Sequence, residues 1–490
     1  MYYAYITRLT NLRKHPNADR LQLGECFGNT VVVSLDYKDN QIGVYFPSDG
    51  QLSAEFATIN NLVRKKDENG NNIGGYMDPE KRNVTAIKLR GEKSDGLFLP
   101  LSSLDYCFND HLKEDPEAAM DVAENHLKEG DRIDVLKGHE ICKKYVPKTS
   151  TRVGRVSDGN KTRKKKVPTA PLFAEHADTE QLAYNLGAFK VGDEIEITLK
   201  MHGTSQRTGY LPTLKGYKRT LWDKITRKEG TPIYDWGYVT GTRRVVLDDF
   251  DGGFYGSNEF REAHSKFFEG KLNKGETVYY EVVGFTHTGT PIMASCDNKK
   301  TQDKEFVKQY GDTTVFSYGC SPTRKTEEYY DTTIDGADIF MERQLPQSDI
   351  YVYRMTMTNE DGFVVEYTPD FMRYRCEQMG VKCVPVFGNA IISNDRLHLI
   401  APDGYDHDYL IGEGTIGDMV MRAAADYCDG PDLIGKTHIR EGVVVRIINR
   451  PKFCAYKHKN WFFKCLEGLV KATADTPDIE EAQDVVNEET

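Results

Sequence analysis

A strongly basic segment divides this chain of 490 residues into two parts that we expect to fold separately. Residues 143–166 include ten lysine or arginine residues and a single acid, Asp158, with serine, threonine, glycine and proline between them. A segment of this composition buries too little apolar surface to join a hydrophobic core, so it predicts a linker. We assign residues 141–170 to this linker, which is either a solvated tether or a contact for phosphate groups.

The length and composition of the chain predict a multidomain protein without a membrane partner. Hydrophobic residues make up 39% of the sequence, and no apolar run approaches the roughly 18 residues of a membrane span. Residues 1–6 lack the basic and then apolar pattern of a secretory signal. The ten cysteines include no Cys-x-x-Cys pair and no dense framework, which excludes zinc ribbons and small secreted disulfide domains. We therefore expect a cytoplasmic protein with reduced cysteines, a location that includes a virally encoded protein in a host cytoplasm.

The distribution of charge matters more than its sum. A formal net charge of −11 excludes a protein that coats nucleic acid through an overall positive field, although local basic patches can still bind phosphate. Residues 472–490 carry seven acids and no lysine or arginine, so they predict a mobile acidic tail.

Residues 1–140 predict a small all-β domain, because short β-branched and aromatic segments alternate with Asn, Asp and Gly turns. Residues 15–21 and 88–97 resemble signature pieces of the OB-fold domains that bind tRNA in synthetase-associated proteins. This resemblance implies an OB-like barrel whose strand face and loops bind nucleic acid. The implied nucleic-acid contacts are Arg20, Lys88 and Arg90. The same residues also suit the turns and strand ends of a barrel without a ligand.

Residues 171–471 predict a larger α+β domain, in which strands alternate with helix-like stretches such as 371–379 and 416–427. Its central feature is a strand that ends in a lysine. In residues 192–200 one strand face carries Ile195, Ile197 and Leu199, and the other carries Glu196, Thr198 and Lys200.

Lys200 therefore points away from the packed face, and Gly203 permits a tight turn and the close approach of a phosphate. A lysine in such a place is a nucleophile where burial or nearby cations favour its neutral form. By itself, the pattern also suits an exposed lysine before a turn.

Two further segments carry polar groups that suit a phosphate site. Residues 240–244 end in Arg243 and Arg244, and a guanidinium group there can hold a phosphate in a fixed geometry. Residues 278–285 place Glu281 in an apolar strand, where a buried carboxylate needs a partner. As plain structure, these would be a solvated arginine pair and an acid paired within the core.

Residues 315–319 are expected to form a strand with Phe316 and Tyr318 on one face. Aromatic side chains in this pattern can stack on a nucleotide base, but such a stripe is also typical of core packing.

The last two segments combine an acid with paired cations. Residues 440–446 place Glu441 before a glycine and an apolar run. Residues 456–460 place Lys457 and Lys459 on one strand face, where two converging ammonium groups require an anion. A surface strand with paired charges would give the same spacing.

Taken in order, these segments resemble the motifs of the covalent nucleotidyltransferases, the superfamily of ATP-dependent ligases and capping enzymes. The nucleophile motif of that superfamily is usually Lys-x-Asp-Gly, whereas this chain has His202 in place of Asp, the form found in nick-sealing RNA ligases. With the OB-like domain in front, the sequence looks most like RNA ligases that carry an amino-terminal OB domain. The resemblance implies an ATP-grasp-like ligase domain built on antiparallel sheets.

The resemblance also implies a role for each residue. Lys200 would carry AMP, Lys457 and Lys459 would stabilise charge on the ATP phosphates, and Glu441 and Glu281 would bind Mg²⁺ or Mn²⁺. The implied nucleotide-binding residues are His176, His202, Gly203, Arg243, Glu281, Phe316 and Glu441, and Arg243 would also contact RNA. For His176 and its neighbours, an alternative is a helix N-terminus capped by Asp178 or Thr179.

The expected activity is ATP-dependent sealing of RNA in RNA repair. AMP would pass from ATP to Lys200 and then to an RNA 5′-phosphate, and a 3′-hydroxyl would displace it. The expected partner is RNA, either a nicked duplex or a tRNA-like molecule, with 3′-hydroxyl and 5′-phosphate ends. Three alternatives remain: a GTP-dependent capping-type nucleotidyltransferase, a DNA ligase, and a non-catalytic tRNA-binding protein.

Overall fold

The structure is a computed structural model that divides into two compact units. Unit 1 comprises Met1–Pro147 and Lys464–Ala474, and unit 2 comprises Lys148–Phe463 and Asp475–Thr490. The residues that the structure describes are 2–66, 72–113, 119–145, 169–177, 179–220, 230–247, 250, 255, 258–301, 303–323, 325–332, 338–402, 404, 406–412 and 414–472. Most of the predicted linker, Asp178 and the predicted tail from residue 473 lie outside the described residues.

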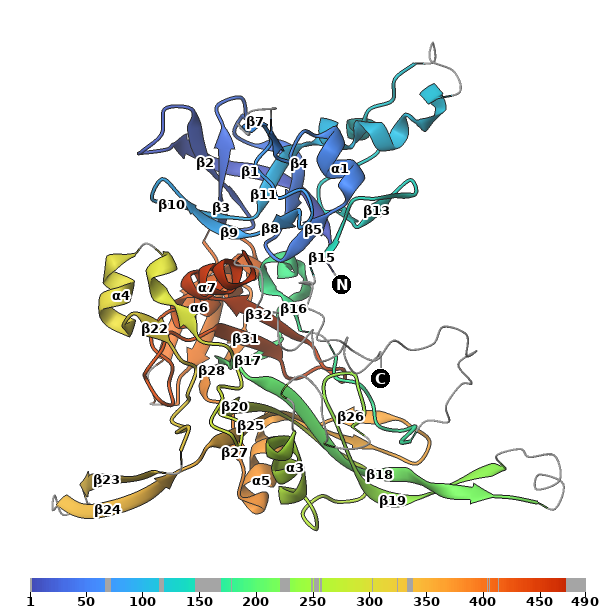
Figure 1. The fold of residues 1–490 in the computed structure, drawn as a ribbon, viewed down its shortest axis with the longest axis vertical. Coiled ribbons are helices and arrows are strands. Elements are labelled where there is room, and N and C mark those ends of the chain that lie inside the picture. Colours follow the sequence, from blue (N-terminus) through green and yellow to red (C-terminus); the bar gives the residue numbers. More distant parts are fainter. Residues whose placement is uncertain are drawn as a thin grey trace. The chain divides into compact units, whose positions relative to one another are not determined.

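Unit 1 is built on a six-stranded antiparallel sheet (Figure 1). Its strand order is β11 (Leu97–Pro100), β4 (Gln41–Phe46), β1 (Ala4–Lys14), β2 (Leu21–Cys26) and β3 (Asn29–Ser34), and β12 (Arg132–Ile133) also pairs with β1. The short strands expected in the all-β domain of residues 1–140 are thereby found. The register of β1 with β2 shifts between Thr10 and Arg13.

The core of unit 1 collects apolar side chains from the sheet and from short helices. It includes Ile6, Val44, Phe46, Phe56, Leu104 and Ile133. Phe56 lies on α1 (Ala54–Ile59), whose amino terminus is capped by the Ser53 side chain. The remaining elements of the unit are β5 (Gly50–Leu52), β6 (Lys65–Lys66), β7 (Asn72–Gly74), β8 (Asn83–Val84), β9 (Ala86–Leu89), β10 (Glu92–Asp95), η1 (Leu101–Phe108), η2 (Asp110–Lys113), η3 (Ala123–Asn125), β13 (Val135–Leu136), β14 (His139–Glu140) and β15 (Cys142–Lys144).

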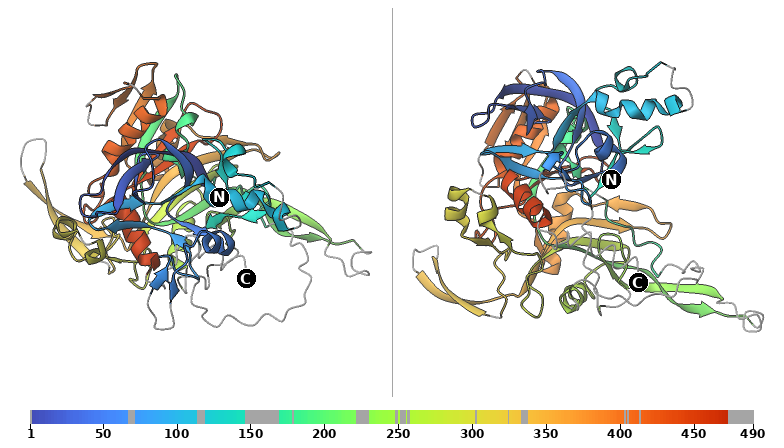
Figure 2. Two further views of the ribbon diagram at one scale, coloured as in Figure 1. Left: turned by 90° about the horizontal axis from the view of Figure 1, so that it is seen from above. Right: turned by 45° about the horizontal axis from the view of Figure 1, so that its top comes forward.

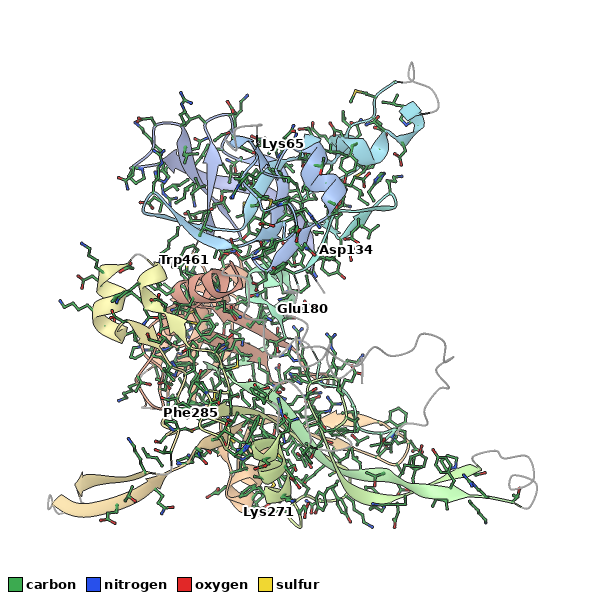
Figure 3. All side chains as sticks on the ribbon, in the orientation of Figure 1. Lys65, Asp134, Glu180, Lys271, Phe285 and Trp461 are labelled. Carbon is green, nitrogen blue, oxygen red and sulfur yellow. The ribbon has the colours of Figure 1, made fainter. Side chains whose placement is uncertain are left out.

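Unit 2 contains two larger sheets, which are mostly antiparallel (Figure 1). The seven-stranded sheet has the order β16 (Glu180–Gln181), β32 (Ala455–Lys459), β31 (Gly442–Ile447), β17 (Glu194–Lys200), β28 (Val386–Ile392), β29 (Arg396–Ile400) and β30 (Asp406–Leu410). The six-stranded sheet has the order β19 (Thr231–Gly241), β18 (Thr204–Lys218), β20 (Glu276–Gly284), β25 (Ser348–Thr358) and β26 (Val364–Glu366), with β27 (Lys382–Cys383) also paired to β25. Figure 3 labels Glu180 at the start of β16 and Phe285 directly after β20.

Helices and shorter elements complete the second unit. The predicted helices at 371–379 and 416–427 are confirmed as α5 (Pro369–Met379) and α6 (Ile416–Cys428). The others are η4 (Leu182–Tyr184), η5 (Leu186–Ala188), α3 (Glu259–Phe267), β21 (Cys296–Asp297), η6 (Asn298–Thr301), α4 (Lys304–Tyr310), β22 (Thr313–Thr314), β23 (Lys325–Thr332) and β24 (Asp338–Leu345). The last helix, α7 (Trp461–Ala472), begins in unit 2 and belongs to unit 1 from Lys464 onward. Within the described part of the chain, no helix is long and apolar enough to span a membrane.

The alternation along β17 builds the seven-stranded sheet as the sequence predicts. Ile195, Ile197 and Leu199 are buried and lie opposite Ile447, Val445 and Val443 of β31. This apolar face packs against α6, which begins with a reciprocal capping pair between Thr415 and Asp418. The polar side chains of β17 therefore lie on the opposite face of the sheet.

One turn carries the chain from the first sheet of unit 2 to the second. Lys200 is the last residue of β17 in the seven-stranded sheet, and Thr204 is the first residue of β18 in the six-stranded sheet. Only Met201, His202 and Gly203 lie between them. The predicted nucleophile motif thus connects the two sheets directly. Its residues lie between β17 of one sheet and β18 of the other.

Candidate active site

Two lysines share one buried carboxylate at the end of β17. The Nζ atom of Lys200 lies 2.7 Å from Oε1 of Glu441, and Nζ of Lys459 lies 3.1 Å from the same oxygen. Strand register explains the meeting, because Lys200 and Lys459 both lie opposite Gly442, the residue after Glu441. The three predicted residues therefore form a single cluster.

Glu441 is held as a carboxylate by its neighbours. Its side chain is only 2% exposed. Burial alone would raise the pKa of Glu441, but Lys200, Lys459 and then His202 outweigh it and lower this pKa to about 2. The second oxygen, Oε2, makes no hydrogen bond within the described residues, and Nδ1 of His202 lies 3.8 Å from it.

His202 is fixed by its backbone and by aromatic rings. Its backbone N–H donates to the hydroxyl of Tyr318 at 2.8 Å. Its ring makes edge contacts with Phe316 and Phe463, with centroid distances of 4.6 and 4.7 Å. The two predicted residues His202 and Phe316 are therefore in contact, and Phe463 joins them from α7. An aromatic cluster of His202, Phe316 and Phe463 therefore lies next to the Lys200–Glu441 pair.

The prediction of a strand through Phe316 and Tyr318 is wrong. The short strand β22 ends at Thr314, after which the backbone N–H of Ser317 bonds to the carbonyl of Val315. Tyr318 has a φ of 47°, in the left-handed region, and Gly319 follows with 77°. A tight turn thus replaces the strand, and both aromatic side chains are still buried.

This turn rests on a buried histidine that the sequence did not single out. The His438 ring contacts Tyr318 and Phe316 edge-on, at 4.6 and 5.2 Å between centroids. His438 and Asp432 are fully buried, with 3.8 Å between Nε2 and Oδ2. Asp432 in turn accepts backbone N–H groups from the following loop. The group orients the aromatic side chains that contact His202.

Gly203 is required by close packing rather than by an unusual φ. A Cβ atom there would lie 2.4 Å from the carbonyl oxygen of Val282 and 2.8 Å from Cγ of Glu281. Gly442 is equally confined, because a Cβ atom would lie 2.1 Å from the carbonyl oxygen of His458. The close approach of a phosphate to Gly203 stays a prediction, and in the structure both glycines also admit a neighbouring strand.

Glu281 lies on β20 beside the same turn. Its side chain is 8% exposed and its residue lies opposite Ser205 of β18. Burial raises the pKa of the Tyr318 hydroxyl well above its ordinary value. The hydrogen bond from His202 opposes this rise, and the negative charges of Glu441 and Glu281 add to it. Both predicted metal ligands therefore lie near one hydroxyl group, and their hard oxygen atoms suit Mg²⁺ or Mn²⁺. The Oε2 atom of Glu441, buried without a hydrogen bond in the described structure, fits such an ion.

Lys457 shares the face of Lys459 through the strand alternation and lies opposite Val444. It is half-buried. Lys459 makes an ion pair with Glu441. The convergence of the two ammonium groups on one anion stays a prediction.

A second cluster surrounds His176. Its backbone N–H donates to the carbonyl of Arg243 at 3.0 Å, and Nη1 of Arg354 lies 3.1 Å from its Nδ1 atom. The Arg207 guanidinium donates to the carbonyls of Thr242 and Arg243, which fixes the turn after β19. Burial, followed by Arg354, Arg243 and Arg207, lowers the pKa of His176 well below its usual value, so this imidazole is neutral.

The structure brings His176 and Arg243 together, as expected for residues of one site. No direct hydrogen bond or ion pair joins them to Lys200 within the described residues. The alternative of a helix capped by Thr179 is not met, because η4 starts at Leu182 with Gln181 at the capping position. Arg244 is exposed, whereas Arg243 is partly buried.

Three of the predicted nucleic-acid contacts, Arg20, Lys88 and Arg90, belong to unit 1, whereas Arg243 belongs to unit 2. Nε2 of His15 lies 3.1 Å from the carbonyl of Leu89, and the Asn17 side chain donates to the carbonyl of Arg90 at 3.0 Å. The two segments that resemble OB-fold pieces are therefore adjacent. Arg20 and Arg90 are exposed, and the side chain of Lys88 lies outside the described part of the structure.

Several residues of the site carried no clear sequence pattern. They are Ser205, Arg207, Tyr353, Arg354, Asp432 and His438. Ser205 and Tyr353, for example, meet through their hydroxyl groups at 2.9 Å although 148 residues separate them. Their alternation on one face of β18 was the sequence pattern that could have pointed to Ser205 and Arg207.

Comparison with known proteins gives one informative likeness. No family model matches the sequence, and no curated protein matches it. A structure of Naegleria gruberi RNA ligase, a lysine-to-alanine variant with ATP and Mn, is similar over 95% of this chain and 98% of its own, with 16% sequence identity and a TM-score of 0.50. A second variant of that ligase without ligand has 16% identity and a TM-score of 0.48 over 94% of this chain and 97% of its own. The first likeness establishes the fold alone: this β-rich chain has the fold of an RNA ligase.

Proposed function

We propose that this protein is an ATP-dependent RNA ligase that forms a covalent adenylate on Lys200. The observation that carries the proposal is the cluster in which Lys200 and Lys459 share the buried Glu441, next to the aromatic rings around His202. The fold of an RNA ligase and the order of the sequence motifs support it.

In the first step, the neutral amine of Lys200 attacks the α-phosphorus of ATP. A bond forms between Nζ and phosphorus, and the bond from phosphorus to the bridging oxygen of the pyrophosphate breaks. Only the neutral amine attacks, so the ion pair between Lys200 and Glu441 must open before the reaction. Lys459, which reaches the same carboxylate, is then placed to stabilise negative charge on the phosphates, with Lys457 farther along the strand.

Glu441 and Glu281 would hold Mg²⁺ or Mn²⁺, which when bound offsets negative charge on the phosphates. Phe316, which lies in the aromatic cluster with His202 and Phe463, is the residue proposed to stack on the adenine base. Tyr318 holds the backbone of His202. The turn of residues 201–203 would therefore position both the adenine base and Lys200.

In the later steps, AMP passes from Lys200 to the 5′-phosphate of an RNA end, and a 3′-hydroxyl displaces AMP to form the phosphodiester. Arg243, fixed by Arg207 and His176, is the proposed contact for RNA in unit 2. Unit 1 is proposed to be an OB-like nucleic-acid-binding domain, in which Arg20, Lys88 and Arg90 contact phosphates. The proposed setting is RNA repair in the cytoplasm.

The test is label transfer from nucleotide to protein. The full chain is incubated with Mg²⁺ or Mn²⁺ and ATP labelled at the α-phosphate, with GTP in parallel, and then denatured. Label from ATP that survives denaturation, that is lost in Lys200→Ala and that is retained in the exposed control Lys304→Ala supports the proposal. Label from GTP alone would indicate capping chemistry, and an adduct that persists in Lys200→Ala would exclude Lys200 as the nucleophile.

The choice of RNA over DNA needs a second assay. Nicked duplexes with either RNA or DNA at the 3′-hydroxyl side are offered to the adenylated protein. Faster sealing of the RNA end supports an RNA ligase, and equal or faster sealing of DNA would reassign the protein as a DNA ligase.

A further inference from the structure

The hairpin of β18 and β19 extends well beyond the sheet that holds its base. Strand β18 pairs with β20 only from Thr204 to Gly209, whereas it pairs with β19 as far as Lys218. Residues 210–218 and 231–238 therefore form a two-stranded ribbon that projects from unit 2 (Figures 1 and 2). Its inner part is held to the unit by backbone hydrogen bonds from Gly275 to Tyr210 and from Leu214 to Thr169, and its outer part extends beyond these contacts.

One face of this ribbon is aromatic. The register places Tyr210 opposite Tyr238, Pro212 opposite Trp236 and Leu214 opposite Tyr234, all on the same face. The Tyr210 and Tyr238 rings are stacked, with centroids 4.7 Å apart and planes at 18°, and the Trp236 ring lies 5.9 Å from Tyr210. Three aromatic rings of β19 and β18 thus form a continuous row, and Tyr234 extends it outward.

The opposite face supplies the packing that holds the ribbon to the unit. Leu211 and Val239 are buried there against Ala170 and Phe173. The base of the aromatic face is also fixed, because the hydroxyl of Tyr238 accepts the backbone N–H of Gly270 at 2.6 Å. Trp236 and Tyr234 lie farther out and remain partly exposed. These outer rings are therefore not needed for the hydrophobic core.

Exposed ammonium groups lie on both faces of the ribbon. The register places Lys218 beside Thr231 on the face opposite to the rings, and a Cβ atom built on Gly237 of that face would lie 2.7 Å from Nζ of Lys215. Lys215, Lys218 and Lys274 are exposed, and no ion pair of these three is found among the described residues. The Nζ atom of Lys274 lies 5.1 Å from the centre of the Trp236 ring. Asp235 is the exposed acid on the described part of the ribbon. A ribbon with an aromatic row on one face, Lys274 at that row and two exposed lysines on the other face suits a strand of nucleic acid, whose bases stack while its phosphates pair with lysine.

We propose that this aromatic and basic ribbon binds a single strand of the RNA substrate, an inference that rests on the proposed ligase function. The ribbon is continuous with the candidate active site, because β18 starts four residues after Lys200. A strand bound along the ribbon therefore leads toward the junction of the two sheets. An apolar protein partner would not require the three exposed lysines, so charge complementarity favours a polyanion.

The test separates RNA binding from adenylate formation. The full chain carrying Trp236→Ala and Tyr234→Ala is compared with Phe363→Ala, which removes an aromatic side chain that is 71% exposed elsewhere in unit 2. The probe is a short single-stranded RNA with a 5′-phosphate and a fluorescent label at the other end. We expect the Kd for this RNA to rise about tenfold or more in the double variant and to stay unchanged in the control.

A charge variant makes the test independent of the rings. Replacing Lys215, Lys218 and Lys274 by alanine should weaken RNA binding and reduce the slope of log Kd against log salt concentration by about 2, because roughly 0.7 of a counterion is released per phosphate contact on a single strand. The matched control replaces Lys299, Lys304 and Lys308. The thermal midpoint and the ATP-dependent labelling of Lys200 should be unchanged in every variant.

The outcomes are distinct. If the wild-type protein forms no adenylate, the proposed ligase function fails, and RNA binding by the ribbon is judged separately from the Kd values. If adenylate forms normally and the ribbon variants bind RNA as tightly as the wild type, the present proposal is wrong. Unchanged RNA binding with an altered oligomeric state would instead assign the aromatic face to a second copy of the chain.

Discussion

The Nζ atom of Lys200 lies 2.7 Å from Oε1 of Glu441, a carboxylate that also receives Lys459 at 3.1 Å. One buried negative charge therefore compensates two ammonium groups. This arrangement holds the two lysines together and ties the proposed nucleophile to the proposed metal ligand.

The first prediction concerns this shared carboxylate. Glu441→Gln should reduce the rate of adenylate formation by about 100-fold or more, because a group that organises charge at the reacting phosphate is lost. It should also lower the thermal midpoint, since the two ammonium groups lose their counter-ion in a buried place. Labelling kinetics and thermal melting provide the two measurements. Glu377→Gln on the exposed side of α5 is the control, and wild-type labelling in Glu441→Gln would contradict the assigned role.

The second prediction concerns the hydrogen bond from the His202 backbone to Tyr318. Tyr318→Phe removes the acceptor and leaves the N–H without this partner, at a cost of about 1–3 kcal/mol. Because this turn also carries Lys200, we expect adenylate formation to slow about ten- to a hundredfold. The KM for ATP should change less than the rate. Tyr374→Phe, at a side chain that is 54% exposed, should behave as the wild type. A change in KM alone would mean that Tyr318 serves binding and not the position of the turn.

The third prediction concerns Gly442, where β31 passes close to β32. Gly442→Ala places a Cβ atom 2.1 Å from the carbonyl oxygen of His458, at a φ of 149°. The strands must separate, so stability should fall by more than about 1 kcal/mol and adenylate formation should be lost with the Lys459–Glu441 contact. Chemical denaturation and labelling measure the two effects. Gly187→Ala, where the added atom meets nothing within 4 Å, should be neutral.

The fourth prediction is a pH dependence in unit 1, away from the candidate site. His139 lies 3.0 Å from Glu55 through Nδ1 and 3.0 Å from Asp110 through Nε2. The bond to Glu55 raises the pKa of His139, burial opposes this, and Asp110 raises it further, so the net shift is upward from 6.5. A raised pKa in the folded state stabilises the fold fully below the unfolded pKa.

This stabilisation should disappear as the pH rises through the pKa of the folded state. Denaturant midpoints of unit 1, followed in the full chain across this range, should therefore fall with rising pH, and His139→Gln should remove that part of the dependence. Because both acids are about half exposed, high salt should weaken the effect. An identical pH profile in His139→Gln would show that the two contacts contribute nothing.

The sequence was most informative where periodicity decides the structure. The alternation through Ile195, Ile197 and Leu199 correctly predicted the buried face of β17, and the spacing of Lys457 and Lys459 correctly predicted their common face. Register then brought Lys200, Glu441 and Lys459 together, which the resemblance to ligases implied but which alternation alone could not establish.

The errors arose where contacts between distant segments override local pattern. The segment with Phe316 and Tyr318 has the alternation of a strand, yet Tyr318 adopts a left-handed backbone because its ring and hydroxyl are held by His438 and by His202. Those partners lie more than a hundred residues away in the sequence. No periodicity records such contacts, and the same holds for the meeting of Ser205 with Tyr353.

The register shift in the pairing of β18 with β19 divides the hairpin into an inner part and an outer part. The register shifts between Leu214 and Gly216, so Lys215 is the extra residue at which the ribbon can bend. Tyr210, Trp236 and Tyr234 all lie on the inner side of this point, on the part of β18 that is continuous with the turn after Lys200. A bend at Lys215 therefore changes the direction of the outermost residue pairs only. The aromatic row keeps its position relative to Lys200.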